Sequence, residues 1–150
     1  MPQLNVDQAD TRRVRAYYGG TATLPSAGAF FCFTDAPTNS AQLGFEVVKP
    51  ATAFLANFAG ILAPSHYGKT GPCYVELIVA GTNVAIYAGS NCVKSTTFVG
   101  PVDGQWYGQA KTALSTLLEI QQAVCLAMET DATLGATPAN VQARIVRPVC

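Results

Sequence analysis

Charged residues are scarce in this sequence. They make up 12% of the 150 residues, and nine basic side chains balance nine acidic ones. Soluble domains typically carry about 25% charged residues, so much of this surface must consist of uncharged side chains. Little charge repulsion keeps such a surface from associating. We therefore expect a protein that works packed against neighbours; the alternative is a neutral monomer with a polar surface.

Long hydrophobic runs are also missing. No apolar stretch approaches the length of about 20 residues that a membrane-spanning helix needs, and there is no lipidation signal. The opening residues, MPQLNVDQADTRR, contain acids, glutamine and arginine where the apolar core of a signal peptide would lie. We expect no membrane partner, and we expect synthesis in a reducing cytoplasm where thiols stay free.

Residues for catalysis or metal binding are few and scattered. His66 is the only histidine, and no cysteine has the local signature of a Cys-His nucleophile. The nearest pair in sequence, Cys73 and Cys92, lies far outside the C-x2-C spacing of zinc sites. Buried cysteines can act as small hydrophobic residues instead. We expect no enzyme, no catalytic residue, no cofactor and no metal. The five cysteines are Cys32, Cys73, Cys92, Cys125 and Cys150.

One triplet resembles part of a phosphate-binding loop. Gly68-Lys69-Thr70 matches the end of the P-loop motif, but Ala63 stands where that motif needs glycine. Gly71-Pro72 follows where the motif requires a helix to begin, and proline disfavours that helix. We therefore reject phosphate binding by this loop.

The run from Phe54 to Ala88 organises the rest of the chain. Between Cys73 and Val79 one parity is apolar and the other is mixed, which is typical of a strand with one buried face. The same alternation resumes from Val84 to Ala88. Because Gly81 and Asn83 between these segments favour a short connection, we predict that the two strands form a tight hairpin.

Further strands are predicted on both sides of this run. Leu118–Glu129 is ambiguous, since its leucines also fit a helical stripe, but we favour a strand because no glycine or asparagine ends it. With seven to nine short strands separated by Gly, Pro, Asn and Asp, we predict an all-β protein whose residues 28–150 form a small antiparallel β-barrel or sandwich. The other expected strands are 29–34, 43–48, 54–62, 96–99 and 141–146.

Residues 1–27 are predicted to form an extended N-terminal arm, because they show no apolar period. Nucleic acid is not the expected partner, since the remaining bases of the chain are scattered rather than gathered on one face. Arginine binds carboxylates with two parallel hydrogen bonds, so we expect the arm to dock on acidic groups of a partner. The candidate partner-binding residues are Arg12, Arg13, Arg15, Tyr17 and Tyr18.

The order of small residues and turns over residues 43–147 resembles the small β-barrel decoration, or cement, proteins of tailed-bacteriophage capsids. That resemblance implies a protein added to the outside of an assembled shell, where it clamps major capsid protein subunits, often as a dimer or trimer. It also implies synthesis in the bacterial host and a final location on the virion. The segments that carry it are Gly44–Val48, Phe58–Ile61, Gly71-Pro72 before Val75–Leu77, Val79–Gly81, Leu118–Ala127 and Val141–Val146.

Two alternatives to a decoration protein stay open. The first is another structural part of the virion, such as a head-fibre base or a tail component, which would differ in its copy number per particle. The second is a small β-barrel that binds a ligand or uses a thiol for catalysis. Loss of labelling at one cysteine after His66→Ala would favour that second alternative.

Overall fold

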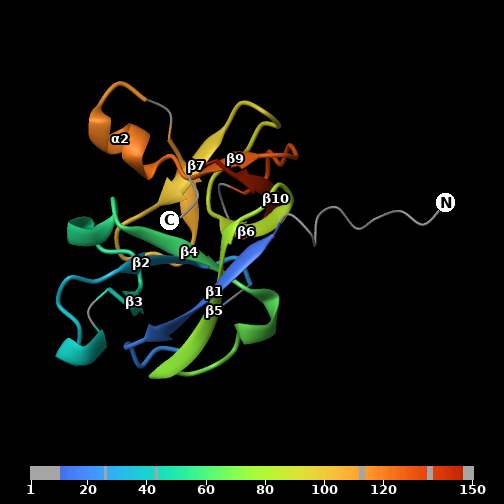
Figure 1. Ribbon diagram of the computed structural model, residues 1–150. Coiled ribbons are helices and arrows are strands. Elements are labelled where there is room, and N and C mark those ends of the chain that lie inside the picture. The colour runs from blue at the N-terminus through green and yellow to red at the C-terminus, as the bar shows by residue number, and fades with distance from the viewer. Residues whose placement is uncertain (1–10, 26, 43, 112–113, 135–136, 147–150) are drawn as a thin grey trace.

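Two closed five-stranded barrels make up this protein, as seen in a computed structural model that describes residues 11–25, 27–42, 44–111, 114–134 and 137–146. The all-β prediction is confirmed, but there are two barrels where one was expected (Figure 1). The first barrel contains β1 (Arg12–Tyr18), β2 (Phe30–Phe33), β3 (Glu46–Val48), β4 (Phe58–Leu62) and β5 (Cys73–Ala80). The second contains β6 (Val84–Ala88), β7 (Phe98–Pro101), β8 (Gly108–Ala110), β9 (Cys125–Ala127) and β10 (Ala139–Ile145).

Among the described residues, helical structure is limited to short pieces between the strands. These are the α-helix α2 (Leu117–Gln122) and single 3-10 turns over Ser40–Gln42, Thr52–Phe54 and Pro64–His66. Within the described parts of the chain, no helix is long and apolar enough to cross a membrane.

The second barrel repeats the topology of the first. In each barrel the first strand runs parallel to the third and antiparallel to the fifth. In each, the second strand pairs antiparallel with the third and the fourth, and the fourth pairs antiparallel with the fifth. The strand order is therefore β1-β3-β2-β4-β5 in one and β6-β8-β7-β9-β10 in the other.

The residue register of the two barrels also agrees. Tyr18 lies opposite Val47 in the first barrel, as Ala88 lies opposite Gly108 in the second. Hydrogen bonds outside the ladders recur too. Gly19 N donates to Val47 O as Gly89 N donates to Gly108 O, and Ala63 N donates to Glu76 O as Met128 N donates to Gln142 O. The chain is a tandem structural repeat.

Phe30 is one of several first-barrel side chains that join the two barrels. Phe30, on β2 of the first barrel, is fully buried in the cluster that forms the core of the second barrel. Its ring lies beside Gly108, where an added Cβ would come within 2.7 Å of the ring. Its backbone N–H donates to Trp106 O at 2.9 Å, and the Trp106 ring packs back on Phe31 in the first barrel. Each barrel thus places aromatic side chains against the core of the other, Phe30 and Phe58 from the first barrel and Trp106 from the second.

The two sides of this junction are not equivalent, because the corresponding positions of the two barrels differ in size. Ala88 and Gly108 leave room for Phe30 in the second barrel. The residues in the same register of the first barrel are Tyr18 and Val47, both buried and both larger. The space that receives an aromatic ring in the second barrel is therefore filled by the first barrel's own side chains.

The predicted hairpin between Cys73–Val79 and Val84–Ala88 is wrong. Both strands exist, but β5 pairs with β1 and β4, whereas β6 pairs with β10 and β8. Residues 81–83 carry the chain from one barrel to the next, and Gly81 O accepts a hydrogen bond from Ile145 N in the second barrel. Apolar and polar residues alternate on both sides of the turn because each strand has one buried face. The buried face of β5 lies in the first barrel, and that of β6 lies in the second.

The predicted strand Leu118–Glu129 is wrong over its first half. Thr116 caps a helix there: its hydroxyl accepts from Glu119 N, and the Glu119 carboxylate accepts from Thr116 N. This reciprocal capping box fixes the start of α2 at Leu117. The strand is confined to Cys125–Ala127, which pairs with β10 as the predicted closing strands should.

The predicted arm is wrong for residues 12–18, because they form β1 between β3 and β5 of the first barrel. An apolar period was overlooked there: Ala16 and Tyr18 are buried, and Val14 lies on the same parity. Residues 1–10 lie outside the described residues. Several other strands are shorter than predicted, with β3 beginning at Glu46 and β4 at Phe58.

Candidate partner-binding site

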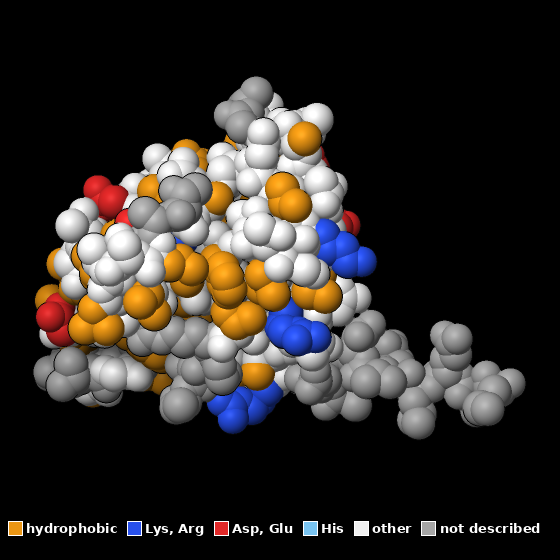
Figure 2. Space-filling view, turned by 90° about the horizontal axis from the view of Figure 1, so that it is seen from above, with side chains coloured by type: hydrophobic (Ala, Val, Ile, Leu, Met, Phe, Trp, Pro, Cys, Tyr) orange, Lys and Arg blue, Asp and Glu red, His pale blue; other side chains and the backbone are white. Residues whose placement is uncertain are grey.

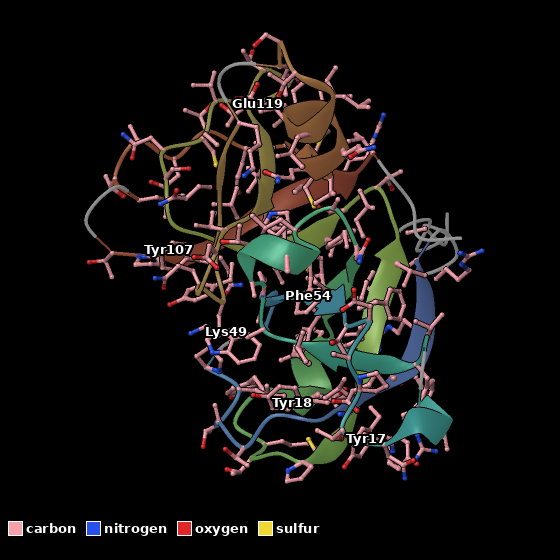
Figure 3. All side chains as sticks on the ribbon, turned by 90° about the vertical axis from the view of Figure 1, so that its left-hand side faces the viewer. Tyr17, Tyr18, Lys49, Phe54, Tyr107 and Glu119 are labelled. Carbon is pink, nitrogen blue, oxygen red and sulfur yellow. The ribbon has the colours of Figure 1, made fainter. Side chains whose placement is uncertain are left out.

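Strand β1 places three of the five candidate residues on the outer face of the first barrel. Successive side chains of a strand point to opposite faces, so Arg13, Arg15 and Tyr17 point away from the core that contains Ala16 and Tyr18. In Figure 3, Tyr17 lies at the end of the molecule opposite Glu119 of α2. The outward side chains of β1 are therefore available to a partner at the first-barrel end.

Strand β5 supplies the neighbours of these residues. Its Glu76 lies opposite Arg15 and its Tyr74 opposite Tyr17 in the antiparallel ladder. Arg13 Nη1 donates to Glu76 Oε1 at 2.8 Å, and the Arg15 guanidinium carbon lies 4.3 Å from the centre of the Tyr74 ring. The Tyr17 and Tyr74 rings meet edge-on with centroids 5.4 Å apart. We call these five residues the basic–aromatic patch.

The patch borders a pocket of about 300 Å³. Arg15 and Lys69 bring positive charge to this pocket, and Glu76 is its acidic member. Burial lowers the pKa of His66, nearby Lys69 and Arg13 lower it too, and Glu76 opposes them. The pocket can therefore accept an anionic group such as a carboxylate. Its lining residues are Arg15, His66, Lys69, Tyr74, Val75 and Glu76.

The contacts of the patch do little for stability. The Arg13–Glu76 pair has side chains 49% and 38% exposed, and ion pairs this exposed contribute about 0–1 kcal/mol. Arg15 stacks on an aromatic ring, an arrangement that leaves the edge of a guanidinium able to donate hydrogen bonds. The arrangement orients arginines at the surface, which suits recognition of acidic groups on a partner.

Two of the candidate residues lie elsewhere. Tyr18 is only 3% exposed and packs edge-on against Phe31 inside the first barrel, so it cannot touch a partner there. Burial raises the pKa of its hydroxyl, and a hydrogen bond with the backbone of Ala22 opposes this rise. Arg12 is exposed beyond a register shift and lines a separate pocket of about 180 Å³ with Val14 and Phe45.

Three members of the site were missed by sequence reasoning. Tyr74 and Glu76 come from β5, and Lys69 comes from the loop before it. Alternation in 73–79 marked Tyr74 and Glu76 as the outward parity. What the sequence did not contain is the pairing of β5 with β1, which brings them beside the arginines.

The four described thiols are placed as hydrophobic residues rather than as nucleophiles. Among the described residues, no group of three or more His, Cys, Asp or Glu side chains could hold a metal ion. Cys32, Cys92 and Cys125 are buried and Cys73 is partly buried, and all four are free.

We expect iodoacetamide to label Cys73 in the folded protein and to spare Cys32, Cys92 and Cys125. Burial raises the pKa of Cys32 to about 12 and also raises the pKa of the other three thiols. Because the thiolate is the reactive form, labelling of Cys73 should quicken as the pH rises above neutral. Mass spectrometry of the labelled peptides measures this. Fast labelling of Cys32, Cys92 or Cys125 at neutral pH would contradict the burial of these thiols. Cys150 lies outside the described residues.

No family model matches this sequence, and no curated protein matches it.

Proposed function

We propose that this protein is a non-enzymatic decoration protein of a tailed bacteriophage. It binds the outside of an assembled shell of major capsid protein and stabilises that shell. On this proposal it is made in the bacterial cytoplasm and ends on the virion surface as a homo-oligomer. A ligand that binds the assembled state and not the free subunits shifts the equilibrium toward assembly by mass action.

The observation that carries this proposal is the basic–aromatic patch. It offers Arg13 and Arg15 on a strand that pairs with β5 at both positions, with Tyr17 and Tyr74 as flat apolar contacts beside them. Arginine and tyrosine are enriched among the residues that dominate protein interfaces. A rigid barrel orders few groups on binding, so little affinity is lost to conformational entropy. Acidic groups on capsid subunits are the partner chemistry that fits.

The test is co-sedimentation with shells of the phage that encodes the protein. We expect the purified chain to pellet with empty assembled shells and to stay in solution with unassembled capsid subunits. Saturation at a copy number near that of the capsid subunits fits a decoration protein, whereas a few copies per particle would favour a fibre base or tail component. Failure to pellet with intact shells would contradict the proposal.

A further inference from the structure

The helix α2 exposes its apolar side chains and buries a polar one. It buries Gln122, whose Oε1 accepts a hydrogen bond from Lys111 Nζ at 3.1 Å, and it exposes its aliphatic side chains. Leu117 is 71% exposed, Leu118 55% and Ile120 52%. Helices on the surface of a soluble protein normally turn their apolar stripe toward the core. Exposed aliphatic side chains gathered in this way mark a contact surface.

A pocket lies beside this helix. It has a volume of about 450 Å³, and Leu114, 40% exposed, contributes to its wall together with Phe98. Strand β7, which carries Phe98, is also the strand that α2 contacts. Figure 2, which views the α2 end of the molecule, shows hydrophobic side chains gathered on this face. One face therefore carries both an apolar projection and a recess. The pocket is lined by Asn91, Thr96, Thr97, Phe98, Ala110, Lys111 and Leu114.

In the first barrel, the face equivalent to this one is buried against the other barrel. Phe98 and Leu126 of the second barrel occupy the register positions of Phe30 and Ile61 in the first. Phe30 and Ile61 are fully buried at the junction between the barrels. Within the described residues no third barrel covers Phe98 and Leu126, and both remain partly exposed.

A second copy cannot cover this face in the way the barrels of one chain pack. That packing needs the space beside Ala88 and Gly108, and in the first barrel Tyr18 and Val47 fill the same space. A projection and a recess on one face instead allow two copies to pack face to face about a two-fold axis. Each copy then inserts its helix into the pocket of the other.

We propose that this face is a homodimer interface, in which Leu117, Leu118 and Ile120 of one copy enter the pocket beside Phe98 of a second copy. The two-fold arrangement covers the aliphatic side chains that α2 exposes. It also leaves the basic–aromatic patch, which lies at the first-barrel end, open on each copy. The inference does not depend on the proposed role at a capsid, since it concerns the isolated chain.

Sedimentation velocity of the full chain tests this inference. We expect a dimer at micromolar concentrations, and we expect the double variant Leu117→Ser/Ile120→Ser to weaken the dimer at least about tenfold, because apolar contacts at the centre of an interface dominate its affinity. Thr96→Arg, which places a long charged side chain at the pocket, should weaken it as well. Both sites are exposed, so circular dichroism should be unchanged.

The matched control is Tyr67→Ser, which removes a 62% exposed apolar side chain from the first barrel. This variant should dimerise as the parent does. A parent chain that stays monomeric at about 100 µM, which implies a weaker than micromolar dimer, would overturn the inference. A dimer unaffected by Leu117→Ser/Ile120→Ser, or equally weakened by Tyr67→Ser, would overturn it too. Shell binding by a monomer would leave the decoration role standing without this interface.

Discussion

Phe30→Ala is expected to lower the free energy of unfolding by about 3–5 kcal/mol, the range for truncating a buried aromatic side chain to alanine. The ring is fully buried, and it belongs to the core of the second barrel although its backbone belongs to the first. Its removal leaves a cavity at the junction of the barrels. Urea denaturation followed by fluorescence measures the loss, with Phe45→Ala, a 36% exposed aromatic of the first barrel, as the control.

A second substitution makes this test specific to the junction. Gly108→Val should also destabilise, by about 1–3 kcal/mol, because the new side chain enters the space that the Phe30 ring occupies. In the double variant the valine occupies part of the cavity that the missing ring leaves, so the double loss should be smaller than the sum. Additive losses, or a loss below about 1 kcal/mol for Phe30→Ala, would contradict the described junction.

Charge reversal in the patch is the second large effect. On the proposal that arginines meet capsid carboxylates, Arg13→Glu/Arg15→Glu should weaken shell binding at least about a hundredfold, since it replaces two attractive contacts by repulsive ones. Binding of the parent should also fall as salt rises, because exposed charges are screened. Co-sedimentation at several salt concentrations measures both effects.

The control for charge reversal is Lys94→Glu, which makes a basic-to-acidic change at an exposed position of the second barrel. Its binding should stay close to that of the parent. An equal loss in Lys94→Glu and in Arg13→Glu/Arg15→Glu would mean that net charge, rather than the patch, governs attachment. Undiminished binding in Arg13→Glu/Arg15→Glu would show that the basic–aromatic patch does not bind the shell.

Local alternation predicted β5 and β10 well, whereas β1, which is as long as β10, was not predicted. In Val141–Ile145 the residues expected to face inward, Val141, Ala143 and Ile145, are buried, and β10 covers that segment. The whole of 73–79 lies within β5. Period-2 alternation reports which face of a strand is buried, and it reports this correctly whether the strand's neighbour lies near or far in sequence.

Alternation could not assign strands to barrels. Gly81 and Asn83 predict a hairpin because such residues favour short strand connections, whereas in the structure Gly81 lies where the chain crosses into the second barrel. The capping box at Thr116–Glu119 was present in the sequence and outweighs the apolar parity that suggested a strand.

The tandem repeat is hard to see in the sequence because equivalent positions at the junction carry side chains of different size. Tyr18 corresponds to Ala88, and Val47 to Gly108, whereas other equivalent positions, such as Phe30 and Phe98, carry the same residue. The differences follow from the junction, since the second barrel must admit Phe30 and the first must close itself. The two barrels therefore agree in the pairing of their backbones although these side chains differ.

The structure places some of the candidate partner-binding residues together and separates others. The cluster of arginines pointed to Arg13 and Arg15, and both do lie on the outer face with Tyr17. Tyr18 was placed with them because the arm was expected to have no inner face, whereas a strand has two faces and sends Tyr18 inward.

Cryo-electron microscopy of phage particles after addition of the protein is the measurement that tests the central claim most directly. The account predicts added density for a pair of joined barrels on the outer surface of the shell, with the β1 and β5 face of the first barrel turned toward capsid subunits. Particles without such density, or density only at the tail or inside the shell, would contradict it.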